Sequence, residues 1–351
     1  MKKITSFTFN LVVCMLFCTL IGAPLIGGAA TGILIGFVPG VPSGSFGMAL
    51  SKEIWQTDIV ANLFADDSFL SKAQNADMYV LAGKVVHKPQ AGTQSSVTKN
   101  RAVLPAAAVK RTDDEITYSL DEYTTDPRLI SDAEKIELSY DKRQSVIKED
   151  QSNLSNIVAS DMIYRWSPTL ASSMIRTTGA AIPAYLPGAT GNRKGILIAD
   201  VSNAAFLMNS QNVPQTGRYC LLDAWMYKQL MDQMTATAQR DFLSTANAAT
   251  GVLGQLYGFS FYQRSLGAKY DNSATPIPQW WNTAGAATDN AAGLFLQQDC
   301  VERALGTVKV FDNPGEAIYY GDIMSFLVRA SGRFSRLDQK GIVALIQAAT
   351  A

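Results

Sequence analysis

The chain has 351 residues, of which 47% are hydrophobic and 17% charged, so it can bury a large core and is not a disordered segment. Thirty basic residues balance thirty acidic ones and no arginine-rich arm is present, so any contact with nucleic acid must be weak or indirect. The four cysteines have neither the spacing of a disulfide framework nor that of paired zinc ligands, and we interpret them as isolated thiols: Cys14, Cys18, Cys220 and Cys300.

The first 47 residues are unusually apolar. Lys2 and Lys3 precede a stretch without charge that lasts until Lys52, and residues 9–38 are almost wholly apolar. This pattern is typical of a secretory signal with small residues at 28–30 for cleavage, and it is also long enough to span a bilayer once. A third interpretation is that translation starts at Met48, and all three stay open at this point.

Residues 51–72 and 79–124 predict an arm followed by a ribbon. Apolar residues at helical spacing favour a short amphipathic helix over 51–72, with a polar turn at 66–68. Residues 79–90 and 115–124 alternate as two strands, and the long loop between them carries basic residues: Lys99, Arg101, Lys110 and Arg111. Because an isolated hairpin is only marginally stable in water, we expect this ribbon to lie on another subunit.

Residues 131–166 predict a long helix. Ser131 and Glu134 have the spacing of a capping box, and no glycine or proline follows until Pro168. At 1.5 Å per residue such a helix would be about 50 Å long, longer than a small domain is wide, which is typical of a spine. The alternative is two shorter helices joined near residues 148–151, where the apolar stripe is weakest.

The C-terminal half predicts a mixed α+β domain. Residues 168–193 are rich in small residues and indicate a loop or linker. We expect strands at 194–200, 254–265 with an interruption at Gly258, 293–298, 307–311, 323–330 and 341–348, and helices at 219–234 and 299–305. Strands and helices alternate without a regular βαβ period, which favours α+β over α/β.

Groups that could carry chemistry are scarce. His87 is the only histidine, and its place on the ribbon indicates a solvated or interface side chain. Residues 139–142 match S-x-x-K without the partner motifs of serine acyl-enzymes, and no phosphate-binding glycine loop is present. Asp113, Asp114 and Glu115 are consecutive and so point in different directions, as expected of a solvated turn.

Two surface features remain for binding. The ribbon lysines could form ion pairs, or covalent links to a neighbouring chain, although exposed charge is the default: Lys84, Lys88, Lys99 and Lys110. Trp280 and Trp281 could form a binding patch, but adjacent aromatics in a loop bounded by prolines more often anchor that loop on the core. We therefore predict no catalytic, cofactor-binding or metal-ligating residues, and no enzyme.

The order of these parts along the chain resembles that of a known protein family. The arm is MALSKEIWQTDIVANLF, the ribbon runs from GKVVHKPQAG to ITYSLDEYTTDPRLI, the spine is SDAEKIELSYDKRQSVIKEDQSNL, and GVLGQLYGFSFYQRS and GTVKVFDN lie in the C-terminal half. Residues 48–351 thereby resemble the major capsid proteins of tailed bacteriophages, which have the Hong Kong 97 fold shared by encapsulin shells. The resemblance divides the chain into an apolar N-terminal segment (1–47), an arm (48–77), an extension loop (78–130), a spine helix with part of a peripheral domain (131–193), and an axial domain with the remaining peripheral strands (194–351).

The resemblance implies a structural function. Such proteins assemble as hexamers and pentamers into an icosahedral shell around double-stranded DNA, in the host cytoplasm, with a scaffolding protein, a portal and decoration proteins as partners. They need no cofactor, and the lysine to asparagine cross-link of some relatives has no matching motif here. The apolar N-terminus departs from the family, and we expect residues 1–47 to be absent from the mature shell; the membrane would be a partner only if residues 1–38 were retained. The alternatives are an encapsulin-like cargo compartment and a secreted or membrane-anchored surface protein.

Overall fold

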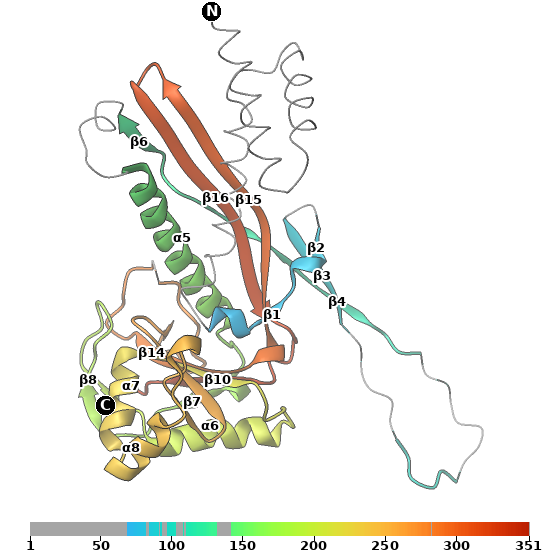
Figure 1. Ribbon diagram of the computed structural model, residues 1–351. Coiled ribbons are helices and arrows are strands. Elements are labelled where there is room, and N and C mark those ends of the chain that lie inside the picture. The colour runs from blue at the N-terminus through green and yellow to red at the C-terminus, as the bar shows by residue number, and fades with distance from the viewer. Residues whose placement is uncertain are drawn as a thin grey trace, which may run out of the picture. The chain divides into compact units, whose positions relative to one another are not determined.

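Two sheets and one long helix organise the computed structural model of the chain (Figure 1). The structure describes residues 69–81, 84–90, 92, 97–102, 108, 110–131, 142–281 and 283–350, with the backbone alone for 142–146 and 248. The apolar segment 1–47, most of the predicted arm helix, Glu134 and Ser139 lie outside these residues. All described residues belong to one compact unit, Asp58–Ala351.

The first sheet, here called the long-hairpin sheet, has five strands in the described part of the chain. Strands β15 (Val301–Glu316) and β16 (Gly321–Phe334) form an antiparallel hairpin, with Val301 opposite Phe334 at its base. Strand β1 (Gln74–Asn75) pairs with β15, and strands β5 (Asp121–Thr124) and β6 (Arg128–Ser131) both pair with β16. Every second residue of β16 is buried over much of its length, as expected of a strand with one face on a core.

Helix α5 (Lys142–Trp166) packs along this sheet (Figure 1). Its side chains at Val158, Met162 and Trp166 are at most 1% exposed. A Cβ at Gly332 of β16 would come within 2.9 Å of the Met162 sulfur and the Trp166 indole nitrogen, so only glycine permits this approach of helix and strand. At 25 residues the described helix is about 37 Å long, and it serves as a rigid support for the hairpin.

The sequence predicted the end of this helix correctly, and residues 132–141, which would form its predicted first turns, lie outside the described residues. The helix does end at Trp166, and it runs without a break through residues 148–151, so the alternative of two helices is wrong. Ser131, however, is the last residue of β6 and pairs with Gly321.

The second sheet, here called the seven-stranded sheet, lies in the C-terminal half. Its described strands follow the order β11-β12-β10-β14-β17-β7, and β13 also pairs with β14. They are β7 (Met174–Arg176), β10 (Arg218–Asp223), β11 (Gly254–Leu256), β12 (Phe259–Arg264), β13 (Ala268–Tyr270), β14 (Asn290–Gln297) and β17 (Ile342–Ile346). Strands β14 and β17 are buried throughout, as central strands covered on both faces should be.

Three helices cover this sheet: α6 (Ile198–Ser210), α7 (Ala224–Gln233) and α8 (Ala236–Leu243) (Figure 1). The remaining described elements are short: η1 (Leu70–Lys72), η2 (Asp77–Tyr79), β2 (Val80–Leu81), β3 (Val85–Gln90), β4 (Asp114–Ser119), η3 (Ala171–Ser173), β8 (Ala181–Pro183), β9 (Asn192–Lys194), η4 (Ala248–Thr250) and η5 (Gln298–Cys300). The fold is therefore α+β, as the sequence predicted.

Three predicted elements are wrong in type. Residues 194–200 are the end of β9 and the start of α6, because buried Asp200 accepts the backbone N–H of Leu197 at 2.9 Å and caps the helix. The first residues of the predicted helix 219–234 form β10, which lies between β12 and β14, and only α7 is helical. Residues 301–305 continue β15 instead of forming a helix.

The other predicted strands of the C-terminal half are confirmed. Residues 254–265 fold into the β11–β12 hairpin, which turns at Tyr257 and Gly258, both with positive φ. Such a two-residue turn matches the twist of the paired strands. Residues 293–298, 307–311, 323–330 and 341–348 lie in or overlap strands β14, β15, β16 and β17.

Candidate assembly interface

The ribbon formed by β2, β3 and β4 is the first candidate interface. Strand β3 pairs with β4 over six residues, from Val85 opposite Ser119 to Gln90 opposite Asp114, which confirms the predicted pairing. Its root packs on the long-hairpin sheet through a small apolar cluster of Ala76, Val86, Leu120 and Ala304. The ribbon therefore buries its root within its own chain.

An ion pair fixes the root of the ribbon. Lys88 of β3 reaches the carboxylate of Glu302 on β15, with 2.6 Å between Lys88 Nζ and Glu302 Oε2. The Glu302 side chain is completely buried and that of Lys88 is 17% exposed. Lys88 also donates to Gln74 Oε1 at 3.1 Å, and Ser335 donates to the same Glu302 oxygen at 3.4 Å.

Two neighbours complete this root. Tyr118 of β4 lies beside the pair, and burial together with the Glu302 carboxylate raises the pKa of its hydroxyl. Arg333 of β16 donates to the backbone carbonyl of Thr117 at 3.1 Å. Both β15 and β16 thus hold β3 and β4, so polar contacts at the root set the direction in which the ribbon leaves the sheet.

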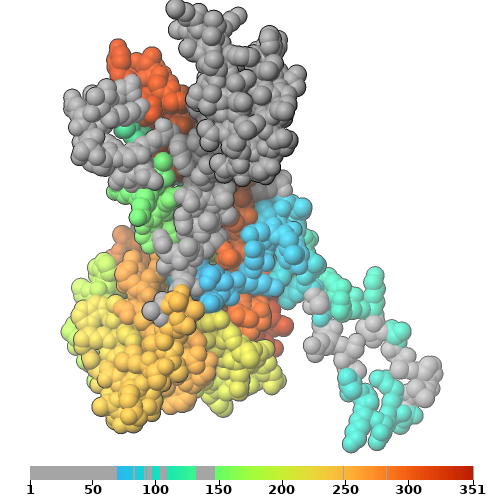
Figure 2. All heavy atoms as spheres, in the orientation of Figure 1, coloured from blue at the N-terminus to red at the C-terminus, as the bar shows by residue number. Residues whose placement is uncertain are grey.

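The distal part of the ribbon has no such support. Beyond Gln90 and Asp114 it stands clear of the other described atoms (Figure 2). An open space of about 1290 Å³ separates Gly92 and Asp113 from Asn212 and Lys340 of the C-terminal half. Its described side chains are almost all exposed, including Val97 at 96% and the basic residues Lys99, Arg101, Lys110 and Arg111.

The charged candidates on the ribbon go to separate partners. His87 Nδ1 lies 2.5 Å from Glu115 Oε1 across the two strands, and both side chains are well exposed. Asp113 pairs with Arg111 and accepts the N–H of Gly92, and the hydrogen bond from Arg111 lowers the pKa of Asp113. These carboxylates therefore do not converge, and the arrangement is that of a solvated surface.

The tip of the β15–β16 hairpin is a second candidate interface. Ile318, Tyr319 and Tyr320 are 77%, 54% and 80% exposed. Tyr320 has φ 50°, and Gly321 begins the return strand. Three large apolar side chains on an exposed turn are costly to hydrate, which is typical of a surface that contacts another protein.

The tryptophan pair anchors a loop, as predicted. Trp281 donates its indole N–H to the carbonyl of Gly267 at 2.9 Å, and Lys269 lies 5.9 Å from the centre of its ring. The Trp280 ring meets that of Tyr164 on α5 edge to face, 5.9 Å between centres. Both rings are half-buried, so they hold residues 271–290 on the body of the protein.

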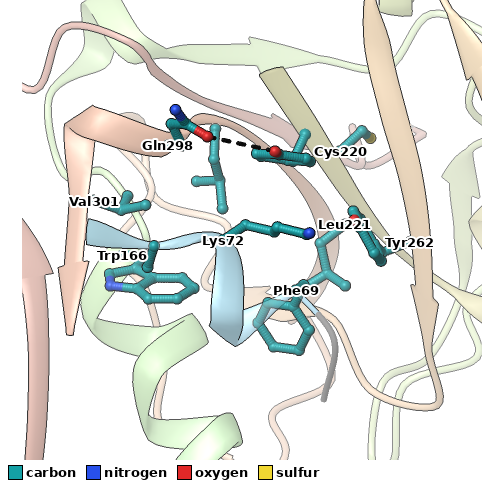
Figure 3. Close-up of a pocket in the computed structure, with 11 residues that line it drawn as sticks. Phe69, Lys72, Trp166, Cys220, Leu221, Tyr262, Gln298 and Val301 are labelled. Carbon is teal, nitrogen blue, oxygen red and sulfur yellow. Dashed lines mark hydrogen bonds between the residues drawn. The ribbon is translucent and has the colours of Figure 1, made fainter. Parts of the chain in front are cut away.

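The contact between the two sheets leaves little space for a ligand. Phe69, Trp166, Leu221 and Tyr262 surround a gap of about 10 Å³, with the stem of Lys72 beside it (Figure 3). That volume holds one water molecule at most. Among the described residues between 69 and 350, no three His, Cys, Asp or Glu side chains lie close enough together to hold a metal ion. Among the described helices none is long and apolar enough to cross a membrane.

Solved structures share this arrangement. The chain aligns with the capsid structure of the cyanophage P-SCSP1u with a TM-score of 0.54 and 18% identity, over 80% of this chain and 87% of that one. The capsid of Ralstonia phage GP4 gives a TM-score of 0.58 at 11% identity, over 79% and 87%. The capsid of a native GTA particle gives 0.54 at 13% identity, over 81% and 90%. The fold is that of the Hong Kong 97-type capsid proteins.

No protein-family model matches the sequence, and no curated protein sequence matches it either. The likeness is therefore one of fold, carried by the order and pairing of the elements described above.

The sequence located the paired strands of the ribbon but not the contacts that hold them on the rest of the chain. Lys88 was noted only as one of four ribbon lysines, because its partner Glu302 lies 214 residues later. The hairpin tip was missed, although Ile318, Tyr319 and Tyr320 directly before a glycine are an aromatic turn that could have indicated it. Ser139 of the S-x-x-K match lies outside the described residues.

Proposed function

We propose that this chain is the major capsid protein of a tailed phage or prophage, a structural protein that assembles into a closed shell around double-stranded DNA. The proposal rests on the β3–β4 ribbon, which we interpret as the extension loop. A buried ion pair holds the root of this loop, and its distal part lies clear of the rest of the described chain. Such a loop needs a neighbour to cover it. The capsid structures with the same fold come from phage and GTA particles, which favours a phage coat over a cargo compartment or a secreted surface protein.

The proposed assembly unit is a ring. A loop on one side of a subunit that rests on a different surface of the next subunit is a heterologous contact, and such contacts form a ring when the rotation between subunits closes. We propose hexamers and pentamers as these rings, with the exposed hairpin tip at Ile318–Tyr320 joining one ring to another. The division into arm, extension loop, spine, peripheral and axial domains follows the same proposal.

The proposed partners follow from charge. With thirty basic and thirty acidic residues the shell contacts packaged DNA weakly and without sequence preference. A scaffolding protein, a portal and decoration proteins complete the proposed particle, which assembles in the host cytoplasm. We propose that residues 1–47 are absent from the mature subunit.

Negative-stain electron microscopy combined with sedimentation tests this function. The full chain and the form that starts at Met48 would be expressed in parallel. Closed shells, or rings of five and six subunits, are the expected result. Monodisperse monomers from both forms would overturn the proposal. The intact mass of subunits from purified particles tests the N-terminus, since a subunit that retains Met1 would refute its removal.

A further inference from the structure

A groove lies between helix α5 and the segment that connects β5 to β6 (Figure 1). Its volume is about 400 Å³, and the residues that line it come from two stretches, 122–128 and 150–157. We propose that this groove binds a calcium ion between Asp126 of the connecting segment and Asp150 of α5. Both carboxylates belong to one subunit, so the site does not depend on the proposed coat function.

Asp150 is the buried carboxylate of this groove. It is 6% exposed, and its Oδ2 atom accepts no hydrogen bond from a described residue. Its Oδ1 atom lies 3.8 Å from Arg128 Nε, which is too far for a hydrogen bond. Burying a carboxylate without hydrogen bonds is costly, because nothing replaces the water that it loses. An unpaired oxygen of this kind beside a groove therefore indicates a ligand that brings positive charge.

The charges around Asp150 are mainly negative. Asp126 and Glu149 are exposed nearby, and neither forms an ion pair with a described residue. Among the described residues that line the groove, Arg128 is the one cation, and its side chain is 58% exposed. Burial raises the pKa of Asp150 against the opposing charge of Arg128, and the charges of Glu149 and Asp126 add to the rise. An added cation would compensate this negative charge.

The other polar groups of the groove are oxygen donors. Asn153 follows Asp150 by three residues, so the two side chains lie on the same face of α5. Thr124 and Asp126 offer hydroxyl, carboxylate and backbone carbonyl oxygens from the opposite wall. None of the described lining residues is a histidine or a cysteine, so the donors suit a hard cation and not a soft transition metal.

Calcium fits this donor set better than magnesium does. Calcium accepts about six to eight oxygen ligands in irregular geometry, with water completing the set, whereas magnesium requires a nearly octahedral arrangement. Donors that come from a helix on one wall and a connecting segment on the other are irregular in this sense. Because only two of them are carboxylates, we expect weak binding, with a Kd of roughly 10⁻⁴ to 10⁻³ M. The ion would tie the connecting segment to α5, in addition to the hydrogen bond from Tyr123 to Asp161.

Titration of the purified full chain with calcium chloride tests the site. Isothermal titration calorimetry in chelator-treated buffer should show one calcium ion bound per chain. Calcium at about 10 mM should raise the melting temperature by about 5 °C, because it binds the folded state alone. A melting temperature that calcium does not change would overturn the inference. Magnesium that binds as tightly as calcium would overturn the assignment of the ion.

Two neutral variants locate the ion. Asp150→Asn keeps the size of the side chain, and with calcium its melting temperature should not rise. Asp126→Asn changes an exposed position, so it should fold normally and bind calcium about tenfold more weakly. Asp241→Asn on α8 is the matched control at an exposed position and should bind calcium like the unaltered chain. An equal rise in melting temperature for all three variants would place calcium elsewhere and overturn the inference.

A third variant should strengthen binding. Arg128 lies close to Asp150 and repels an added cation, so Arg128→Gln should tighten calcium binding roughly threefold to tenfold. If Asp150 served only as a partner of Arg128, this change would leave calcium binding unaltered. Calcium binding that is unchanged or weaker in Arg128→Gln would therefore overturn the inference, whether or not the chain forms shells.

Discussion

Removing the charge of Lys88 should destabilise the subunit more than any exposed charge change. Lys88→Met keeps the length and the apolar stem of the side chain but leaves the Glu302 carboxylate fully buried without its cation. The gross attraction at 2.6 Å is about 6 kcal/mol for an effective dielectric constant of about 20, and the cost of desolvating both charges offsets much of it. Breaking such a pair by removing one partner nevertheless costs roughly 3 to 5 kcal/mol, because the remaining charge stays buried.

Urea unfolding of unassembled subunits measures this cost. Tryptophan fluorescence is a suitable signal, because the indole of Trp166 donates to the backbone carbonyl of Glu302 at 3.0 Å and so reports on the same place. Lys84→Met, at an exposed position on the same ribbon, is the matched control and should change the free energy of unfolding by less than about 0.5 kcal/mol.

The double variant Lys88→Met, Glu302→Leu separates the charge from the packing. Replacing both partners by apolar side chains removes the buried charge, so stability should return to within about 1 kcal/mol of the unaltered chain. A loss below about 1 kcal/mol in Lys88→Met alone would refute the reasoning, because it would mean that Glu302 is solvated or neutral in the folded subunit. Limited proteolysis adds a structural check: cleavage between Gln90 and Asp114 should not change, and cleavage near the root should increase.

Three further predictions concern single positions. Trp166→Phe removes the indole donor from the buried Glu302 carbonyl and should cost about 1 to 3 kcal/mol in urea unfolding; no loss would show that water replaces the indole. Gly258→Ala introduces a side chain at φ 82° and should cost about 1 kcal/mol, measured as a lower melting temperature in calorimetry. An unchanged melting temperature would contradict the strain expected at this turn. Burial raises the pKa of Asp150, so the ionised form of this carboxyl group opposes folding. Asp150→Asn should therefore stabilise the unassembled subunit at neutral pH, and this gain should vanish as the pH falls through the raised folded-state pKa. A gain in stability that grows toward low pH would contradict this expectation.

The extension loop also offers a deletion. Removing residues 83–117 would take away Val86, Lys88 and Ile116, which are buried or paired at the root, so the whole deletion would destabilise the subunit as well as remove the loop. Replacing only residues 92–112 by a short glycine and serine turn leaves the root intact. This variant should stay folded and fail to form shells, and normal shells would refute the intersubunit role of the loop.

The sequence by itself determined the elements whose signals are local. The alternation of Ile116, Tyr118 and Leu120 predicted a ribbon strand, and Gly258 predicted an interruption of the extended segment 254–265, which the structure shows to be a hairpin turn. The apolar runs at 293–298 and 341–348 predicted strands that lie in the centre of the seven-stranded sheet. Each of these signals arises from neighbours along the chain, which is why no knowledge of the fold was needed.

Only the tertiary structure decided the elements whose partners are distant. Ser131 joins β6 because Gly321 offers it a strand edge, and Tyr219–Asp223 is extended because β12 and β14 bond to it on both sides. The same holds for the candidate interface, since the Lys88–Glu302 pair joins segments that are 214 residues apart in the sequence. A hydrogen bond or an ion pair forms only between atoms that are close in space, and residues far apart in the sequence come that close only in the folded chain.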